Sequence, residues 1–514
     1  MSSSRTKNTI INFGSGAFTQ ILNIVLSFIV RTIFIKNLSA EYLGVNGLFT
    51  NILTILSFAE LGIGNAIIYN MYKPVSENDY EKIKSLMKLY RVSYRIIGII
   101  VAVIGLSIIP FMNFIIKDAP DIKESLILIY LLFLLNTVLS YFYTYKKSII
   151  SAHQKEHIIN NYKMYFYIIK SILQVLLLIF TKNFIIFLII QIICTFLENL
   201  FTSIKANKMF PYLKEKNIES ISEREKKSIF SNVKSLVTYK LGSVILNGTD
   251  NIIMSSMISI SIVGICSNYT MIISSIVGVL GTALNGITAS IGNLNTIKDS
   301  NKKEEVFYQT LFITSWIYSF CSVAILILIN PFIELWLGSQ YILVYDAVIA
   351  LVLHMYINGV QFAGYTYRTT LGLFEKGKYA PIIAAIMNIF LSIILARYIG
   401  ITGIFIATSI SRLCTTTWLD AYLVHKYEFK TPVIKFLKKY VFYLVIFIIN
   451  FILCNYLSSL IMYNELTNFI LNFIIVMLVP NIIMIIIFHN TDEFIGIKGK
   501  LFSLFTTFKN QMAQ

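Results

Sequence analysis

Three basic residues of this 514-residue chain, Arg31, Lys240 and Arg412, lie inside long apolar segments. A charged side chain at the centre of a bilayer costs about 2.5–3.5 kcal/mol on insertion scales, so such residues usually face other helices or a water-filled cavity. The planar guanidinium of Arg binds two phosphate oxygens at once, and the ammonium of Lys acts as a point charge. We therefore expect these side chains to bind an anionic headgroup such as a phosphate.

Neutral polar residues accompany two of these bases at helical spacing. The first apolar segment carries Asn12, Gly16, Gln20, Asn23, Ser27 and Arg31, and the positions 220 residues later carry Asn232, Leu236, Lys240, Ser243, Asn247 and Asn251. At about 100° per residue, each set falls within an arc of about 100°. The repeat predicts two similar half-molecules that share a polar cavity. We expect its neutral lining to include Asn12, Gln20, Asn23, Ser27, Ser243, Asn247 and Asn251.

Three carboxylates, Glu60, Asp250 and Asp420, are candidates for gating or ion coupling. Asp250 has nearly the same predicted depth as Arg31, so the two could form a gate latch or a permanent ion pair. Glu60 is expected mid-span, where it could exchange a proton unless a Lys pairs with it. Asp420 is expected near an inner helix end, where structural or gate contacts are the simplest role.

The composition requires many helices in a membrane. The chain is 56% hydrophobic and only 13% charged, with a mean hydropathy of +0.72, whereas soluble proteins carry about 25% charged residues. An all-α integral membrane protein with about fourteen spans is therefore predicted. The expected spans are residues 10–35, 43–71, 89–116, 125–150, 158–181, 183–205, 230–257, 262–294, 306–333, 341–373, 380–397, 401–425, 439–461 and 467–489.

The net charge of +17 is distributed unevenly along these spans. With the N-terminus inside, 34 of the 43 Lys and Arg residues fall in internal segments and five in external loops. This is the positive-inside pattern, so both termini are predicted to be in the cytoplasm. Anionic inner-leaflet lipid accounts for the basic charge, and no nucleic-acid partner is needed. His153 and His157 lack further ligands, so neither a metal site nor a cofactor is expected.

A second signal of duplication lies outside the polar stripes. Gly44 matches Gly264 at the 220-residue offset, and at an offset of 222 Tyr145-Lys146 matches Tyr367-Arg368 and Glu198 matches Asp420. A polar loop separates the halves, and its Ser222-Glu-Arg-Glu225 fits a capping box that opens the next helix. The predicted parts are a six-helix lobe (1–205), a cytoplasmic loop (206–229), a second six-helix lobe (230–430), two further spans (431–490) and an amphipathic cytoplasmic tail (491–514).

Two segments resemble a known family. Residues 31–45, RTIFIKNLSAEYLGV, resemble the end of the first helix in bacterial polysaccharide flippases. Residues 250–269, DNIIMSSMISISIVGICSNY, resemble the end of their seventh helix, where an Asp precedes a short turn and a Val-Gly-x-Tyr-like start of helix eight. The resemblance implies the fold of the multidrug/oligosaccharidyl-lipid/polysaccharide exporter (MOP) superfamily, a MATE-like fold.

The same resemblance implies a function and partners. Such flippases move undecaprenyl-pyrophosphate-linked repeat units of O-antigen, capsule or teichoic-type polymers across the cytoplasmic membrane. It implies an alternating-access transporter rather than an enzyme, with a lipid-linked substrate and an H+ or Na+ counter-ion. A polysaccharide polymerase and glycosyltransferases would be its partners.

Two other functions stay open. A cation-coupled multidrug exporter of the same fold would favour an acidic, aromatic cavity, and its proton-coupled forms often place an acid in helix one, where this chain has Arg31. A membrane glycosyltransferase or polymerase would need catalytic acids and a large external loop, which the predicted topology does not provide. The sequence therefore favours the flippase.

Overall fold

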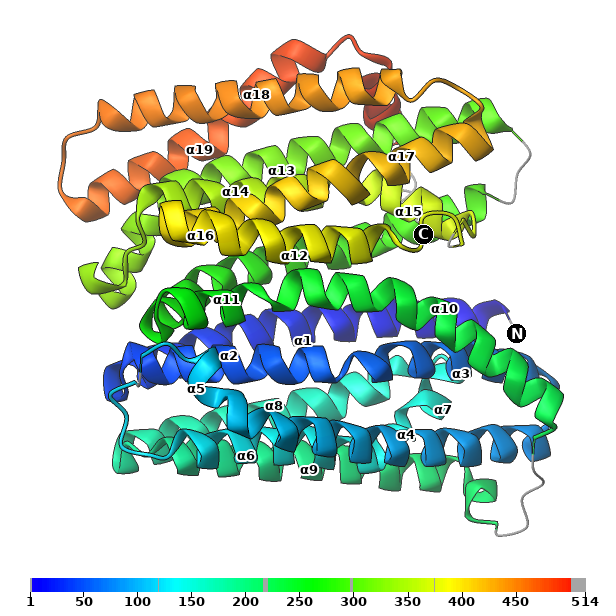
Figure 1. Cartoon of the computed structure of the whole chain (residues 1–514). Coiled ribbons are helices and arrows are strands. Elements are labelled where there is room, and N and C mark those ends of the chain that lie inside the picture. The colour runs from blue at the N-terminus through cyan, green and yellow to red at the C-terminus, as the bar shows by residue number, and fades with distance from the viewer. Residues whose placement is uncertain (1, 119, 216–220, 296–298, 374, 501–514) are drawn as a thin grey trace, which may run out of the picture. The chain divides into compact units, whose positions relative to one another are not determined.

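The computed structural model describes residues 2–118, 120–215, 221–295, 299–373 and 375–500. Side chains are described for these residues except 2–13, 58–59, 61–63, 65–67, 224, 228, 230–240 and 289. Every regular element in this part of the chain is a helix, as Figure 1 shows. The contacts divide the chain into two compact units, residues 1–282 and 283–514.

Unit 1 contains eleven complete helices and most of a twelfth. They are α1 (Ser2–Asn37), α2 (Ala40–Leu56), α3 (Phe58–Glu77), α4 (Tyr80–Ile108), α5 (Met112–Ile115), α6 (Leu126–Thr144), α7 (Lys147–Ala152), α8 (Glu156–Thr181), α9 (Phe184–Met209), α10 (Glu223–Gly248), α11 (Asp250–Met257) and α12 (Ile260–Leu294). The predicted capping box is confirmed, because the Glu225 backbone N–H donates to the Ser222 hydroxyl and α10 begins at Glu223.

Unit 2 contains the end of α12 and seven further α-helices. They are α13 (Ser300–Leu337), α14 (Tyr345–Val360), α15 (Phe362–Thr370), α16 (Ala380–Arg412), α17 (Trp418–Val424), α18 (Ile434–Ser459) and α19 (Glu465–Phe488). Two π-helical turns, Leu413–Thr417 and His425–Phe429, flank α17. Residues 492–500 form one more helical segment, whereas Leu501, Phe505 and Phe508 of the predicted amphipathic tail lie outside the described residues.

Eleven helices of the described chain are long and apolar enough to cross a membrane. The fourteen expected spans exceed this number for three identifiable reasons. The expected span 43–71 is broken into α2 and α3, and 230–257 is broken into α10 and α11. Residues Ala380–Phe429 count as one span although two were expected there. The all-α, multi-pass membrane architecture predicted from the sequence is thus confirmed.

Helix α16 reverses direction at Gly400, which has φ of +58°. A glycine tolerates this left-handed conformation without strain. The two arms lie against each other, because the Asn388 amide donates to the Thr408 hydroxyl across 2.8 Å. A Cβ on Gly403 would collide with the Leu395 carbonyl, so glycine also permits the close approach. This long helix is therefore a hairpin of two spans, as the sequence predicted.

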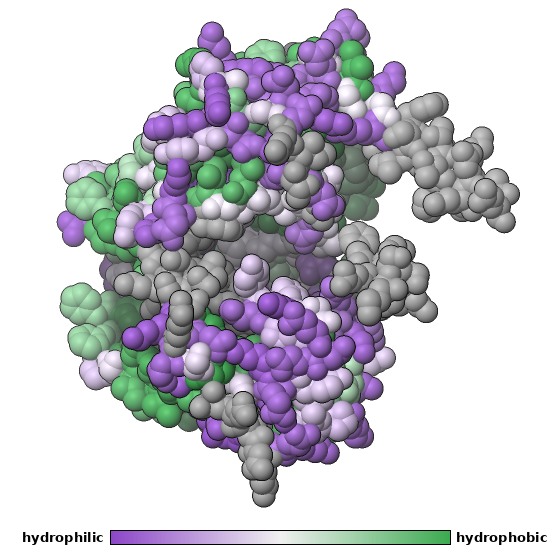
Figure 2. Space-filling view, turned by 90° about the vertical axis from the view of Figure 1, so that its right-hand side faces the viewer, coloured by the Kyte–Doolittle hydropathy of each residue, from purple (hydrophilic) through white to green (hydrophobic). Residues whose placement is uncertain are grey.

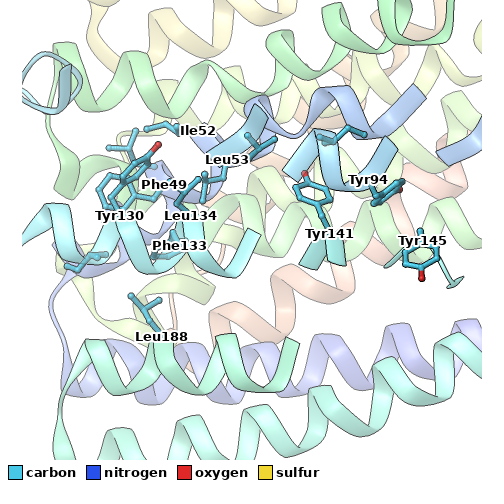
Figure 3. Packing of buried hydrophobic residues seen from close by; sticks show 14 of the residues in the cluster. Phe49, Ile52, Leu53, Tyr94, Tyr130, Phe133, Leu134, Tyr141, Tyr145 and Leu188 are labelled. Atoms are coloured by element: carbon cyan, nitrogen blue, oxygen red, sulfur yellow. The ribbon is translucent and has the colours of Figure 1, made fainter. Parts of the chain in front are cut away.

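The core of unit 1 is aromatic (Figure 3). The ring of Phe49 on α2 packs edge-on against Tyr130 and Phe133 of α6, with centroid distances of 5.2 and 5.9 Å. Further along, Tyr94 of α4 packs against Tyr141 of α6 at 5.9 Å. Edge-to-face pairs of this kind contribute about 0.5–1.5 kcal/mol beyond the area they bury. This core holds α2, α4 and α6 together.

A repeated ion pair closes one end of each unit. Asp79 caps α4 and Asp299 caps α13, each accepting a backbone N–H three residues later. Lys84 on α4 then pairs with Glu215 after α9, and Lys303 on α13 pairs with Glu428 after α17. Figure 2 looks onto the end of the helices where α4 and α10 begin, and hydrophilic residues gather there.

Candidate functional site

The side chain of Arg31 extends from α1 to α12. Its guanidinium donates to the Ser267 hydroxyl at 2.8 Å and to the Asn268 side-chain oxygen at 3.4 Å. Within the described part of the chain, no carboxylate forms an ion pair with Arg31. A guanidinium has five N–H donors and no acceptor, so two neutral partners leave donors and a full positive charge. Arg31 can therefore bind an anion.

The rest of the first polar stripe divides between two neighbouring helices. Gln20 lies against α12, since a Cβ on Gly278 would come within 2.5 Å of its amide nitrogen. Ser27 instead hydrogen-bonds the Tyr167 hydroxyl of α8 at 2.7 Å. The side-chain oxygen of Asn23 is inaccessible and has no hydrogen-bond partner. The stripe thus faces protein at these three positions.

The second stripe follows α10 and α11. Asn247 is exposed, and its amide donates to the Ser243 carbonyl at 2.7 Å. Asn251 lies against α2, where a Cβ on Gly47 would be 3.6 Å from its amide nitrogen. The side chains of Asn12 and Lys240 lie outside the described residues. Their predicted roles stay predictions.

Asp250 is the first residue of α11, and it is half-buried where α10 ends and α11 begins. A carboxylate in the first turn interacts favourably with the positive end of the helix dipole. The sequence suggested that Asp250 could approach Arg31, but both polar partners of Arg31 are on α12. Ser267 and Asn268 were missed in the sequence, although two adjacent polar residues inside an expected span were a usable signal.

A ring of contacts joins the first repeat to the α11–α12 turn within unit 1. Ser261 donates to Glu41 at 3.3 Å, and Lys117 donates to the carbonyls of Ser255 and Met257 at 3.2 and 3.3 Å. Gly44 and Gly264 lie where α2 crosses α12. These contacts are at the end of the unit opposite the starts of α4 and α10 (Figure 1). Arg31 belongs to this closure.

Glu60 lies on α3, three residues after the break at Ser57. The Tyr94 hydroxyl donates to its carboxylate at 3.1 Å. Glu60 also lines a pocket of about 250 Å³ between α2, α3, α6 and α9. This is the carboxylate that the sequence placed mid-span.

Arg412 and Asp420 lie in the interior of unit 2, where they are 8% and 1% exposed. Asp420 forms an ion pair of 2.7 Å with Arg368 and accepts a 2.9 Å hydrogen bond from Gln361. Arg368 is itself only 1% exposed. The sequence gave Arg368 only as a repeat match and missed its partner, which the matching of Glu198 with Asp420 could have indicated.

Comparison with solved structures identifies this architecture. The chain is similar to the lipid II flippase MurJ in an inward closed conformation, with 19% identity, 94% of this chain and 99% of MurJ covered, and a TM-score of 0.63. An inward-facing multidrug resistance MATE family transporter of the MOP superfamily gives 16% identity, coverage of 78% and 97%, and a TM-score of 0.57. The MATE transporter VcmN of Vibrio cholerae gives 12% identity, coverage of 84% and 98%, and 0.56.

The chain therefore has the fold of these MOP-type transporters and flippases, as the resemblance predicted. None of the three is an enzyme, in agreement with the non-enzyme prediction. No protein-family model matches the chain. No curated protein matches it either.

Proposed function

We propose that this chain is a flippase that moves an undecaprenyl-pyrophosphate-linked oligosaccharide across the cytoplasmic membrane. The observation that carries the proposal is Arg31, a guanidinium within a span whose described polar partners are neutral oxygens. A buried charge without a counter-charge is unfavourable, and a pyrophosphate would supply one. The fold, shared with MurJ and MATE transporters, supports a transport role.

Neutral groups near Arg31 suit the sugar. Gln20 lies on the same helix beside α12, and the side-chain oxygen of Asn23 has no partner. An acceptor of this kind can take a hydrogen bond from a sugar hydroxyl, which recovers the free energy lost by burying it alone. The polyprenyl tail can stay in lipid while the headgroup crosses. Lys240 and Arg412 are kept as predicted headgroup contacts.

The contacts between the first repeat and the α11–α12 turn act as the outer gate in this proposal. In the orientation predicted from the positive-inside pattern, they lie at the external side. With this end closed, the headgroup loads from the cytoplasm, and release requires α2 and α12 to separate. Such rocking of one repeat against the other is the usual form of alternating access. Polymerase and glycosyltransferase partners would supply and consume the lipid-linked unit.

The test is flipping by purified protein in liposomes that contain a fluorescent undecaprenyl-pyrophosphate oligosaccharide in the inner leaflet. Appearance of the sugar at an external glycosidase reports transport. We expect R31A to reduce the rate at least about tenfold, because a hydrogen bond to a charged group contributes about 1.5–3 kcal/mol. The control R397A removes an exposed Arg at the α16 hairpin.

Equal rates for R31A and the wild type would overturn the Arg31 assignment. Transport of ethidium in place of the lipid would instead favour the multidrug exporter. Both substrates are therefore measured in the same vesicles, with protein insertion checked by protease protection.

A further inference from the structure

The span formed by α2 and α3 is interrupted at Ser57. The Ser57 hydroxyl donates to the Leu53 carbonyl at 2.7 Å, and the Glu60 N–H donates to the Ser57 carbonyl at 3.1 Å. A helix that stops inside a membrane leaves carbonyl groups at its end without partners from its own turn. Such interrupted helices commonly bind ions in transporters. The break also places Glu60 within one turn of the end of α2.

The pocket beside this break is lined mainly by oxygen-bearing side chains. Its lining residues are Thr50, Leu53, Thr54, Ser57, Glu60, Phe133, Asn136, Thr137 and Gln191. The side-chain oxygen of Asn136 is inaccessible, and it has no hydrogen-bond partner among the described residues. A buried acceptor without a donor is unfavourable, and a bound cation would satisfy it.

Three hydroxyl groups of the pocket have already used their hydrogen atoms. Thr54 donates to Thr50 O at 2.7 Å, Thr137 donates to Phe133 O at 3.1 Å, and Ser57 donates to Leu53 O. A hydroxyl whose proton is engaged can only present lone pairs to the pocket. Lone pairs from hydroxyl, amide and carboxylate oxygens favour a hard cation.

The charge of the pocket selects among cations. Glu60 is the single carboxylate of the lining. Lys147, a base whose charge reaches Glu60, is ion-paired with Glu198 at 2.8 Å. Divalent cations usually bind through several carboxylates, and the described chain has no group of three His, Cys, Asp or Glu that could hold a metal. One negative charge among neutral oxygens matches a monovalent ion.

We propose that the pocket at the α2–α3 break binds Na+, with Glu60 and the Asn136 oxygen as ligands. Leu53 and Phe133, which line the pocket, belong to the packed core shown in Figure 3, so the ligand positions are held by a rigid base. The inference deepens the proposed function by naming its coupling ion and rests on that function only for the consequence of binding. An ion at this site would join α2 and α3, and α2 carries one side of the proposed outer gate.

The experiment measures 22Na+ binding to the purified full-length protein in detergent without lipid substrate, with choline chloride holding the ionic strength constant. We expect saturable binding that E60Q weakens at least about tenfold, the lower limit for loss of one metal-site interaction. N136A should weaken it as well. The matched control E156Q removes an exposed carboxylate at the start of α8 and should bind as the wild type does.

Wild-type affinity in both E60Q and N136A would overturn the proposal, as would the absence of saturable binding in the native protein. If E60Q does not fold, as judged by size-exclusion chromatography, N136A and T137V decide the question. Because no lipid substrate is present, failure of the flipping assay leaves this result intact. Normal flipping without Na+ binding would refute this site alone.

Discussion

Gly44 of α2 and Gly264 of α12 lie against each other, and a Cβ on Gly264 would be 3.0 Å from the Gly44 backbone nitrogen. A Cβ on Gly44 would overlap the Ile260 carbonyl, and one on Gly264 would overlap the Ala40 carbonyl. The two glycines are one repeat apart in the sequence. Equivalent positions of the two halves therefore meet at the helix crossing that the proposed outer gate depends on.

We predict that G264V opens this crossing. Overpacking of a close contact costs about 1–3 kcal/mol, which shifts an equilibrium roughly five- to a hundredfold. The reporter is Cys266, a fully buried thiol two residues away on α12. In a protein whose other four cysteines are replaced by Ser, the maleimide labelling rate of Cys266 should rise by a similar factor. G281V is the control, because nothing lies within 4 Å of a Cβ there; equal rates in both variants would contradict the prediction.

The sequence predicted much of this arrangement because polar residues and glycines are scarce in membrane spans. The 220-residue offset matched Gly44 with Gly264 before any contact was known. The partner of Arg31 could not be predicted in the same way. Depth along a helix places Asp250 level with Arg31, but a rotation of about 100° per residue decides which neighbour a side chain reaches, and that rotation depends on packing.

The breaks in the spans were also beyond hydropathy. The expected span 43–71 is continuous in its apolar character, yet α2 ends at Leu56 and α3 begins at Phe58. Ser57 hydrogen-bonds the preceding turn, and Ser occurs in unbroken membrane helices too. The aromatic core of Phe49, Tyr130 and Phe133 is likewise formed by residues about 80 positions apart. Tertiary packing fixes such features.

A second prediction concerns the Arg368–Asp420 ion pair in unit 2. Both side chains are 1% exposed, and removing one member of a buried pair leaves an uncompensated charge that costs about 3–5 kcal/mol. We expect D420A to lower the melting temperature in detergent by several degrees. The double variant R368M/D420L should recover much of the loss. K378A, which breaks the exposed pair with Glu375, should change the melting temperature little, and equal losses in both single variants would refute the assignment.

A third prediction concerns pH. The hydrogen bonds from Lys82 and Ser222 lower the pKa of Glu225 below its ordinary value of 4.5. A carboxyl with a lowered folded-state pKa stabilises the fold above pH 4.5, and this stabilisation is lost as the pH falls through the folded-state pKa. Lys82 of α4 and Glu225 of α10 are 2.5 Å apart and partly exposed, so the contribution is at most about 1 kcal/mol.

Spin labels at positions 77 and 227 measure this contact by pulsed electron resonance. We expect the distance distribution to broaden below pH 4.5 in the wild type. In E225Q it should already be broad at neutral pH and should not change on acidification. A narrow, pH-independent distribution in E225Q would show that Lys82 and Glu225 do not hold the start of α10.

The last prediction concerns the helical segment 492–500, which packs on unit 2. The ring of Phe494 stacks on Trp316 of α13 with centroids 6.0 Å apart and planes at 19°. Glu493 pairs with Lys439 of α18, and Lys500 donates to Gln309 at 2.5 Å. Removing the ring should expose the indole and loosen the segment, since Phe-to-Ala truncations in packed sites cost about 3–5 kcal/mol.

We therefore expect F494A to shift Trp316 fluorescence to longer wavelength in a protein whose Trp336 and Trp418 are replaced by Phe. Proteolysis within residues 489–500 should also become faster, because two ion-linked contacts at the surface cannot replace a stacked aromatic ring. I495A truncates a neighbouring side chain that is 56% exposed and should leave both measurements unchanged. If F494A and I495A behave alike, the segment is held by Glu493 and Lys500 alone, and K439A should then release it.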